Sequence, residues 1–131
     1  MTQIKALELF FEKYIDKLFD KYSKNMWRFD RLWNKACEDV IKQEQQLLLD
    51  IYNMYAKAIN PGEQRVLRLN QFIEIVVKSN VIDDNFGERE IGPLFGLSMM
   101  TQVDEIYSTR HINMQFIEFV EAVARVAERV Y

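Results

Sequence analysis

The chain has 131 residues, of which 49% are hydrophobic and 13% are aromatic, so it is long enough and apolar enough to fold around a core. Its 17 basic and 20 acidic residues are interspersed and give a net charge of −3, which provides no basic stripe for binding nucleic acid. Four Gly and two Pro supply too few turns for a sheet protein, so the composition predicts an all-α fold.

The first predicted element is an amphipathic helix over residues 4–22, with Thr2 as its N-cap. Apolar residues recur three or four apart from Ile4 through Leu7 and Phe11, and charged residues occupy the opposite side. Acidic residues spaced four apart weaken this helix in isolation, so packing must hold it. The helix either folds onto the body of the protein or extends as an arm toward a partner helix.

A long helical stretch is predicted over residues 25–58, with a bend near residues 38–41. Trp27 and Trp33 are about 240° apart around such a helix, so we expect one of them to be exposed. Pro61 is expected to end the stretch, because it has no N–H and disfavours helix at the preceding residue. We assign residues 1–41 to an N-terminal helical extension and residues 42–131 to the body.

Three further helices are predicted after Pro61. Residues 70–78 are almost entirely apolar and are expected to be buried, and the cluster beginning at Asp83 is expected to form a turn that caps the next helix. That helix is predicted to start near Gly92, with Pro93 in its first turn, and to run to residue 105.

The last helix, from residue 116 to the C-terminus, has the clearest amphipathic pattern. Its core-facing stripe consists of Phe116, Phe119, Val120, Val123, Ala127 and Val130. The residues expected to remain in solvent are Glu118, Glu121, Arg125, Glu128 and Arg129.

An internal repeat relates two parts of the chain. The order of residue types in residues 67–74 matches that in residues 114–121, so Leu67 corresponds to Met114 and Phe72 to Phe119. Repeated helix–loop–helix units pair because each alone leaves its apolar face unburied. We expect Leu67 and Met114 to meet in a short two-stranded bridge between the two loops.

The hydrophobic Met114 followed by Glu118 and Phe119 resembles the end of an EF-hand loop and the start of its exiting helix. The two loops would then be residues 60–71 and 107–118. An EF-hand binds calcium through oxygen ligands at loop places one, three, five and twelve and a backbone carbonyl at place seven, with Gly at place six. These places hold Asn60, Gly62, Gln64, Arg65 (place six), Val66 (place seven) and Gln71 in the first loop, and Tyr107, Thr109, His111, Ile112 (place six), Asn113 (place seven) and Glu118 in the second.

Glu118 is the one acidic residue at these places, so the resemblance implies that neither loop binds metal at physiological calcium and that Glu118 is at most a weak candidate ligand. Short sequence stretches within residues 101–127 also resemble degenerate EF-hand proteins of the cilia and flagella of protists. That resemblance implies a ciliary or cytoskeletal scaffold and transfers no site.

Catalytic chemistry is not predicted. His111 is the only possible histidine base, and with a single cysteine, Cys37, it cannot complete a zinc site. The four glycines form no phosphate-binding loop, and Cys37 has no disulfide partner in the chain. No apolar run reaches the roughly 18 residues of a membrane span, and the charged N-terminus does not read as a signal peptide. We expect a cytosolic, nuclear or cytoskeletal protein.

These observations predict a calcium-independent interaction or scaffold module with no cofactor, whose partner is another protein, either an amphipathic helix or a cytoskeletal assembly. Its groove would be constitutively open or filled by the chain's own helix of residues 4–22. Two alternatives stay open: a calcium sensor that uses Glu118, and a self-associating helical structural subunit. The candidate partner-binding residues are Met54, Leu94, Phe95, Met99, Met100, Met114, Phe119, Phe10, Phe11, Trp27 and Trp33.

Overall fold

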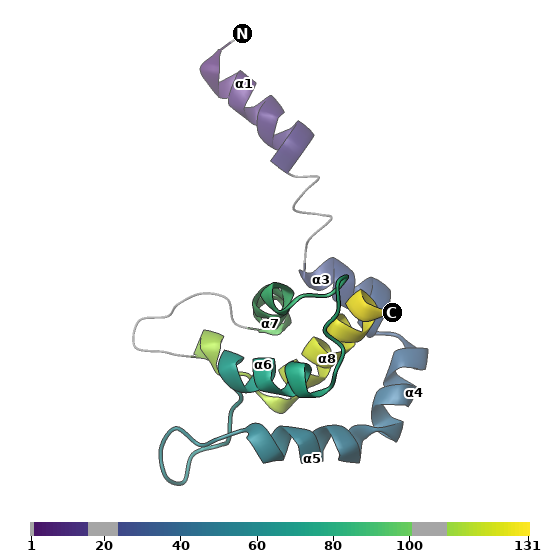
Figure 1. Ribbon diagram of the computed structural model, residues 1–131. Helices are drawn as coiled ribbons and strands as arrows, with labels where there is room; N and C mark the ends of the chain where they lie inside the picture. Colours follow the sequence, from purple (N-terminus) through teal and green to yellow (C-terminus); the bar gives the residue numbers. More distant parts are fainter. Residues whose placement is uncertain (1, 16–23, 101–109) are drawn as a thin grey trace. The chain divides into compact units, whose positions relative to one another are not determined.

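The computed structural model of the chain describes residues 2–15, 24–100 and 110–131, and most of these residues are helical (Figure 1). The all-α prediction is therefore confirmed. The chain divides into two compact units, Met1–Glu38 and Asp39–Tyr131, whereas the sequence placed the division after residue 41. None of the described helices is long and apolar enough to cross a bilayer.

The N-terminal unit begins with helix α1 (Gln3–Phe10), which continues into a π-helical turn, η1 (Phe11–Ile15). The predicted N-cap is confirmed, because the Thr2 hydroxyl accepts a hydrogen bond from the Lys5 N–H at 3.2 Å. None of the α1 residues is buried. The predicted continuation to residue 22 lies outside the described residues.

The stretch predicted as one long helix is broken into α3 (Lys24–Trp27), a π-helical turn η2 (Arg28–Leu32), α4 (Lys35–Gln43) and α5 (Gln45–Tyr55). The predicted bend at residues 38–41 is wrong, since these residues lie inside α4.

The breaks in this stretch fall at Trp33 and Glu44, on either side of α4. Asn34 starts the new helix after the first break, because its side-chain oxygen accepts a hydrogen bond from the Cys37 N–H at 2.9 Å. Trp33 is exposed and Trp27 is half-buried, as expected for one exposed tryptophan.

Helix α5 ends before Pro61 because the chain turns into a hairpin. Ala56 is extended, and Lys57 and Val66 exchange backbone hydrogen bonds of 2.9 and 3.0 Å. Pro61 lies in the hairpin turn rather than at a helix end. Gly62, at φ +84°, supplies the left-handed conformation that the turn needs.

The rest of the C-terminal unit contains α6 (Leu69–Lys78), a 3₁₀ turn η3 (Glu88–Glu90), α7 (Ile91–Ser98), a 3₁₀ turn η4 (Arg110–Ile112) and α8 (Phe116–Val130). Helix α8 packs against α7 and α5, and α6 contacts both α5 and α7 (Figure 1).

The predictions for α6, α7 and the turn between them have mixed outcomes. Helix α7 ends at Ser98, so Met99 and Met100 lie beyond it, and the predicted extension over residues 101–105 lies outside the described residues. The turn at Asp83 is confirmed, since its carboxylate accepts hydrogen bonds from the N–H groups of Asn85 and Phe86 at 2.8 Å. Its predicted capping role is wrong, because the N-cap positions of η3 and α7 are Gly87 and Glu90. The helix predicted to be buried, α6, leaves Val77 exposed.

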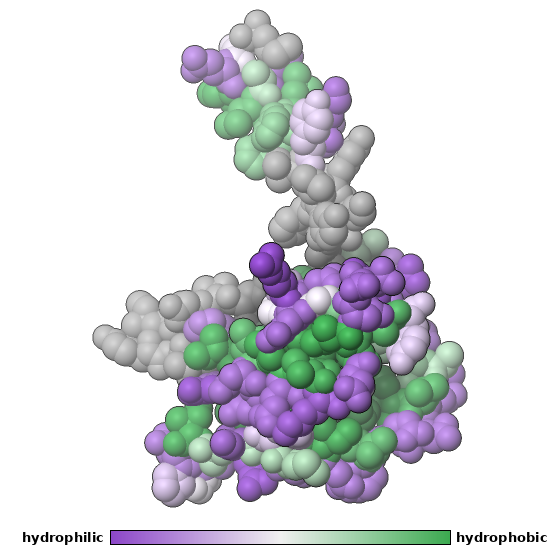
Figure 2. Space-filling model, viewed as in Figure 1, coloured by the Kyte–Doolittle hydropathy of each residue, from purple (hydrophilic) through white to green (hydrophobic). Residues whose placement is uncertain are grey.

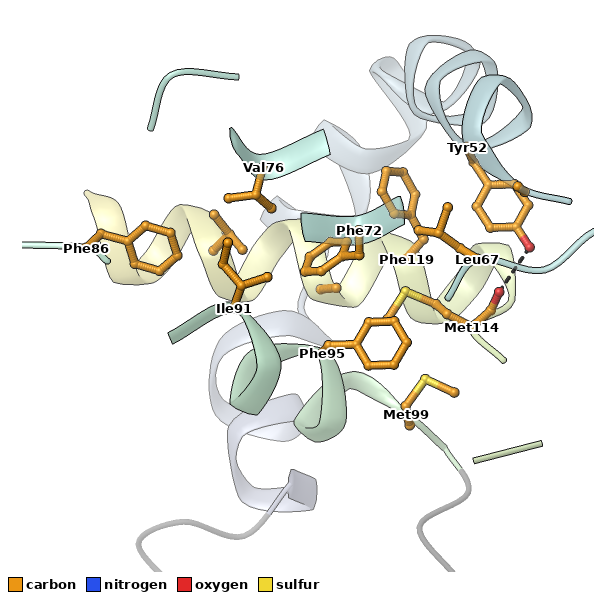
Figure 3. Close-up of a cluster of buried hydrophobic side chains, with 13 residues drawn as sticks. Tyr52, Leu67, Phe72, Val76, Phe86, Ile91, Phe95, Met99, Met114 and Phe119 are labelled. Carbon is orange, nitrogen blue, oxygen red and sulfur yellow. Dashed lines mark hydrogen bonds between the residues drawn. The ribbon is translucent and has the colours of Figure 1, made fainter. Parts of the chain in front are cut away.

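A core of aromatic and aliphatic side chains joins these helices (Figure 3). Phe72 of α6 lies between Phe95 of α7, at 5.9 Å between ring centroids, and Phe119 of α8, at 6.4 Å. Tyr52 of α5 lies 5.8 Å from Phe119 at the other end of the cluster. These tilted and edge-on ring pairs link all four helices through a single set of contacts.

The two repeated segments contact each other through equivalent residues. Leu67 and Met114 form the antiparallel bridge expected from the sequence, with hydrogen bonds of 2.8 and 2.7 Å between their backbones. Phe72 and Phe119, which also correspond in the repeat, meet edge-on. Two pairs of equivalent residues in the repeat are therefore in direct contact.

Helix α8 carries buried charges on the face that was expected to be wet. Glu118, Glu121 and Arg125 are all buried, and Glu121 pairs with Arg125 at 3.2 Å. The prediction is wrong for these three residues because α8 is contacted by more than one helix. A prediction from one apolar stripe therefore assigns too few of the α8 residues to the buried surface. Glu128 and Arg129 are exposed as expected.

Candidate functional site

The side chain of Glu118, in the first turn of α8, is fully buried and its two oxygens are both engaged. Oε1 accepts a hydrogen bond from the Gln115 N–H at 2.9 Å and lies 2.8 Å from the Arg110 guanidinium. Oε2 accepts a hydrogen bond from the Met100 N–H at 2.6 Å. These partners satisfy a buried carboxylate that would otherwise be costly to desolvate.

Arg110 brings a positive charge to Glu118 and to the backbone just before the bridge. Its Nη2 pairs with Glu118, and its Nη1 donates a hydrogen bond to the Asn113 carbonyl at 2.9 Å. These two acceptors stand at places twelve and seven of the predicted loop, which in a calcium-binding hand are both ligands. A guanidinium is permanently charged and offers several donors in one plane, so it can satisfy both oxygens at once.

The other predicted ligand positions add little to this arrangement. His111, at place five, lies in the η4 turn, and Tyr107 and Thr109 lie outside the described residues. Within residues 2–15, 24–100 and 110–131, no three His, Cys, Asp or Glu side chains gather closely enough to hold a metal ion.

The base of the first loop is closed. The Lys57–Val66 backbone pair makes a hairpin of the segment that the sequence assigned to a loop over residues 60–71. The ends of the two loops make the same hydrogen bond. The Gln71 side chain accepts a hydrogen bond from the Arg68 N–H at 2.8 Å, and the Glu118 side chain accepts one from the Gln115 N–H. The side chain at place twelve therefore caps the exiting helix in both halves of the repeat.

An apolar groove of about 240 Å³ lies on the C-terminal unit between α5, α6 and α8. Ser79 and Tyr131 are the only lining residues with polar side-chain atoms, and the Ser79 hydroxyl already donates to the Val76 carbonyl at 2.8 Å. The lining residues are Leu48, Ile51, Phe72, Ile75, Val76, Ser79, Val81, Phe119, Val123, Val126, Ala127, Val130 and Tyr131.

The face of this unit seen in Figure 2 exposes apolar surface between bands of hydrophilic residues. Water in an apolar groove has few hydrogen-bond partners, so apolar side chains are the occupants that suit this one.

Of the predicted partner-binding residues, Phe119 is the only one that lines this groove. Phe95, Met99, Met114 and Phe119 are buried in the core, so the first three offer no surface to a partner in this structure. Leu94 is half-buried, and Met54 and Met100 are exposed outside the groove lining. In the N-terminal unit, Phe10, Phe11 and Trp33 are exposed and Trp27 is half-buried.

Sequence reasoning missed two features of this region. The groove is lined by aliphatic residues such as Val123, Ala127 and Val130 rather than by methionines. The sequence signal that could have indicated this lining was the spacing of these residues, three or four apart on α8. Arg110 was also missed as a partner of Glu118. The signal there was a basic residue inside the predicted second loop, where Glu118 is the one acidic residue at the expected ligand places.

No family model, no curated protein and no solved structure matches this chain in the comparisons with known proteins. The functional interpretation therefore rests on the geometry of the chain itself.

Proposed function

We propose that the protein is a calcium-independent protein–protein interaction module built from two EF-hand-like helix–loop–helix units that have lost their metal. The observation that carries this proposal is the Arg110 guanidinium, which lies 2.8 Å from the Glu118 carboxylate and donates to the Asn113 carbonyl. A calcium ion in the second loop would have to displace this fixed charge from both oxygens. The loop then needs no metal to hold its shape.

The groove supports the interaction part of the proposal. It is open, about 240 Å³ in volume and apolar, which suits the apolar face of an amphipathic helix. Because Arg110 is a permanent part of the chain, the groove has no calcium-driven opening step. The partner is thus a protein segment that binds whether calcium is present or not, as expected of a structural component of the cytoskeleton or of a cilium.

Calorimetric titration of calcium into the full chain tests the proposal against a calcium sensor that uses Glu118. We expect no heat of binding at micromolar calcium, both in the unmodified chain and in Glu118→Gln. Micromolar binding that disappears in Glu118→Gln would contradict the proposal and favour the sensor.

A further inference from the structure

A second pocket, of about 230 Å³, lies beside the hairpin and the start of α6 and shares no lining residue with the apolar groove. Its lining among the described residues consists of Lys57, Ala58, Ile59, Val66, Arg68 and Gln71. None of these described residues is acidic, and each of the three polar side chains can donate a hydrogen bond. The pocket lining therefore carries two positive charges and no negative one.

The backbone places the two cations on the same face of the chain. Lys57 and Val66 stand opposite each other in the antiparallel bridge, so their side chains lie on one face. Arg68 is extended and comes two residues after Val66, so its side chain lies on that face as well. Leu67, between them, is fully buried in the core, which leaves the opposite face of this segment to the pocket.

Both cations keep unused donors in the part of the chain that the structure describes. The Arg68 Nε donates to the Asn113 side-chain oxygen at 3.3 Å, but the two terminal nitrogens of Arg68 have no hydrogen-bond or ion-pair partner. The Lys57 ammonium has none either. An anion in the pocket would use these donors and offset the repulsion between the two charges.

The third polar residue, Gln71, adds a neutral donor. Its side-chain oxygen accepts a hydrogen bond from the Arg68 N–H at 2.8 Å, so its amide nitrogen is the group left for a ligand. Gln71 lies in the first turn of α6, whose first N–H groups have no carbonyl acceptor within the helix. Arg68, at the N-cap position, has no side-chain acceptor to offer them. The start of α6 therefore adds to the positive potential around the pocket.

We propose that this pocket binds the phosphate group of a phosphorylated serine or threonine in a partner protein. Near pH 7 such a phosphate carries about two negative charges and three acceptor oxygens, which match two cations and an amide donor. A carboxylate would leave one of the cations unmatched. The pocket is smaller than the roughly 300 Å³ at which small-molecule sites begin, so it suits one side chain rather than a whole nucleotide. Ala58, Ile59 and Val66 provide apolar contacts for the carbon atoms of that side chain.

Titration of the ¹⁵N-labelled full chain with the peptide acetyl-Ala-phosphoserine-Ala-amide, followed by NMR, tests the site. We expect the backbone amide signals of Leu69, Asn70 and Gln71 to shift at millimolar peptide, and the binding to weaken as sodium chloride is added. The same peptide with unmodified serine should shift none of them. Amide signals that do not respond to the phosphopeptide would overturn the proposal.

Two variants alter the recognition and retain the fold. Lys57→Gln removes one charge and leaves the backbone pair with Val66 in place. Gln71→Glu replaces the amide by a carboxylate that can make the same cap, as Glu118 does in the other half of the repeat. Each should keep its melting temperature and bind the phosphopeptide about tenfold more weakly. Arg89→Gln removes an exposed charge outside the pocket and is the matched control, which should bind normally. Normal binding by either pocket variant would overturn the proposal.

Inorganic phosphate distinguishes a partner's side chain from a free ion. We expect it to bind more weakly than the phosphopeptide, because it lacks the carbon atoms that contact Ala58, Ile59 and Val66. Inorganic phosphate that binds as tightly as the phosphopeptide would overturn the assignment to a phosphorylated side chain.

Discussion

The guanidinium of Arg110 lies 2.8 Å from the buried carboxylate of Glu118 and donates a second hydrogen bond to the Asn113 carbonyl. The side chain thereby neutralises the acidic residue in the first turn of α8 and binds the backbone of the residue before the bridge. Because this charge is part of the chain, the buried carboxylate is neutralised without a bound ion.

Replacing Arg110 by Ala should lower the free energy of unfolding by about 2–3 kcal/mol, because it leaves Glu118 buried without its cation. This loss of stability is small for breaking a buried ion pair, since the Arg110 side chain is 29% exposed. Urea unfolding in EDTA measures it. Arg110→Lys should recover part of the loss, whereas Lys78→Ala, which breaks an exposed pair with Glu74, should change little. An Arg110→Ala protein as stable as the unmodified chain would refute this role.

Calcium should not raise the melting temperature of the unmodified chain. A site with a dissociation constant of 1 μM would stabilise the folded state by about 4.1 kcal/mol at 1 mM calcium, an effect that thermal unfolding detects easily. Melting curves in EDTA and in 1 mM calcium should therefore overlay. Magnesium at the same concentration controls for ionic strength, and an upward shift specific to calcium would count against the proposed function.

Replacing Tyr52 by Phe should cost about 1 kcal/mol near neutral pH. The Tyr52 hydroxyl lies 2.8 Å from the Arg65 carbonyl. It also lies 3.1 Å from the Met114 carbonyl (Figure 3), so it joins the hairpin to the bridge. Urea unfolding measures the loss, and Tyr14→Phe, at an exposed tyrosine, is the control.

The same residue makes stability depend on pH in the alkaline range. Burial, and secondarily the negative charge of Glu118, raise the pKa of Tyr52 above 10.0. Above pH 10 the unfolded chain therefore loses this proton before the folded chain does, and stability falls as the pH rises through the folded-state pKa. Urea unfolding between pH 8 and 11 should show a shallower decline in Tyr52→Phe. Equal declines in the two proteins would contradict the assignment.

Two glycine substitutions should have opposite signs. Gly62 adopts φ +84° in the hairpin turn, so Gly62→Ala should destabilise the protein by about 1 kcal/mol. Gly96 lies inside α7 with open space where a Cβ would stand, so Gly96→Ala should stabilise it by about 0.4–1 kcal/mol. Thermal unfolding of both variants checks the contrast, and the same sign for the two would show that the backbone assignment of one of them is wrong.

Burial along α8 can be checked on neighbouring residues. Phe119 is buried among Tyr52 and Phe72, so Phe119→Ala should cost about 3–5 kcal/mol. Ile117, two positions earlier, is 65% exposed, so Ile117→Ala should stay within about 0.5 kcal/mol of the unmodified chain. Denaturant unfolding measures both, and similar costs at the two positions would contradict the packing of the helix.

The repeat was the most informative part of the sequence. Matching Leu67 to Met114 correctly predicted a backbone bridge between segments far apart in the chain. The match was informative because equivalent positions of two paired repeats tend to lie next to each other. Helix boundaries were less predictable. The apolar pattern continued past Tyr55, yet the helix ends there, since the backbone of Lys57 pairs with Val66 in a contact that depends on tertiary structure.

Charged residues were placed less well than apolar ones. The helical periodicity predicts that Glu118 is exposed, because it considers only whether a residue is apolar or charged and not which partners its side chain has. Its burial depends on Arg110, eight residues earlier, and on the Met100 backbone, which no local pattern connects to it. Met99 and Met114 were expected to contact a partner, but they fill the core, where a flexible side chain suits an irregular space.

The hairpin closed by Lys57 and Val66 has a practical use. Its backbone pair holds the two arms together below the turn, and the turn residues from Ile59 to Arg65 are all exposed. Extra residues inserted between Pro61 and Gly62 would lengthen an exposed tip, so an epitope placed there should leave the folded unit intact. Such an internal label, unlike a tag fused ahead of Thr2, would leave the N-terminal helix native while the protein is located in cells.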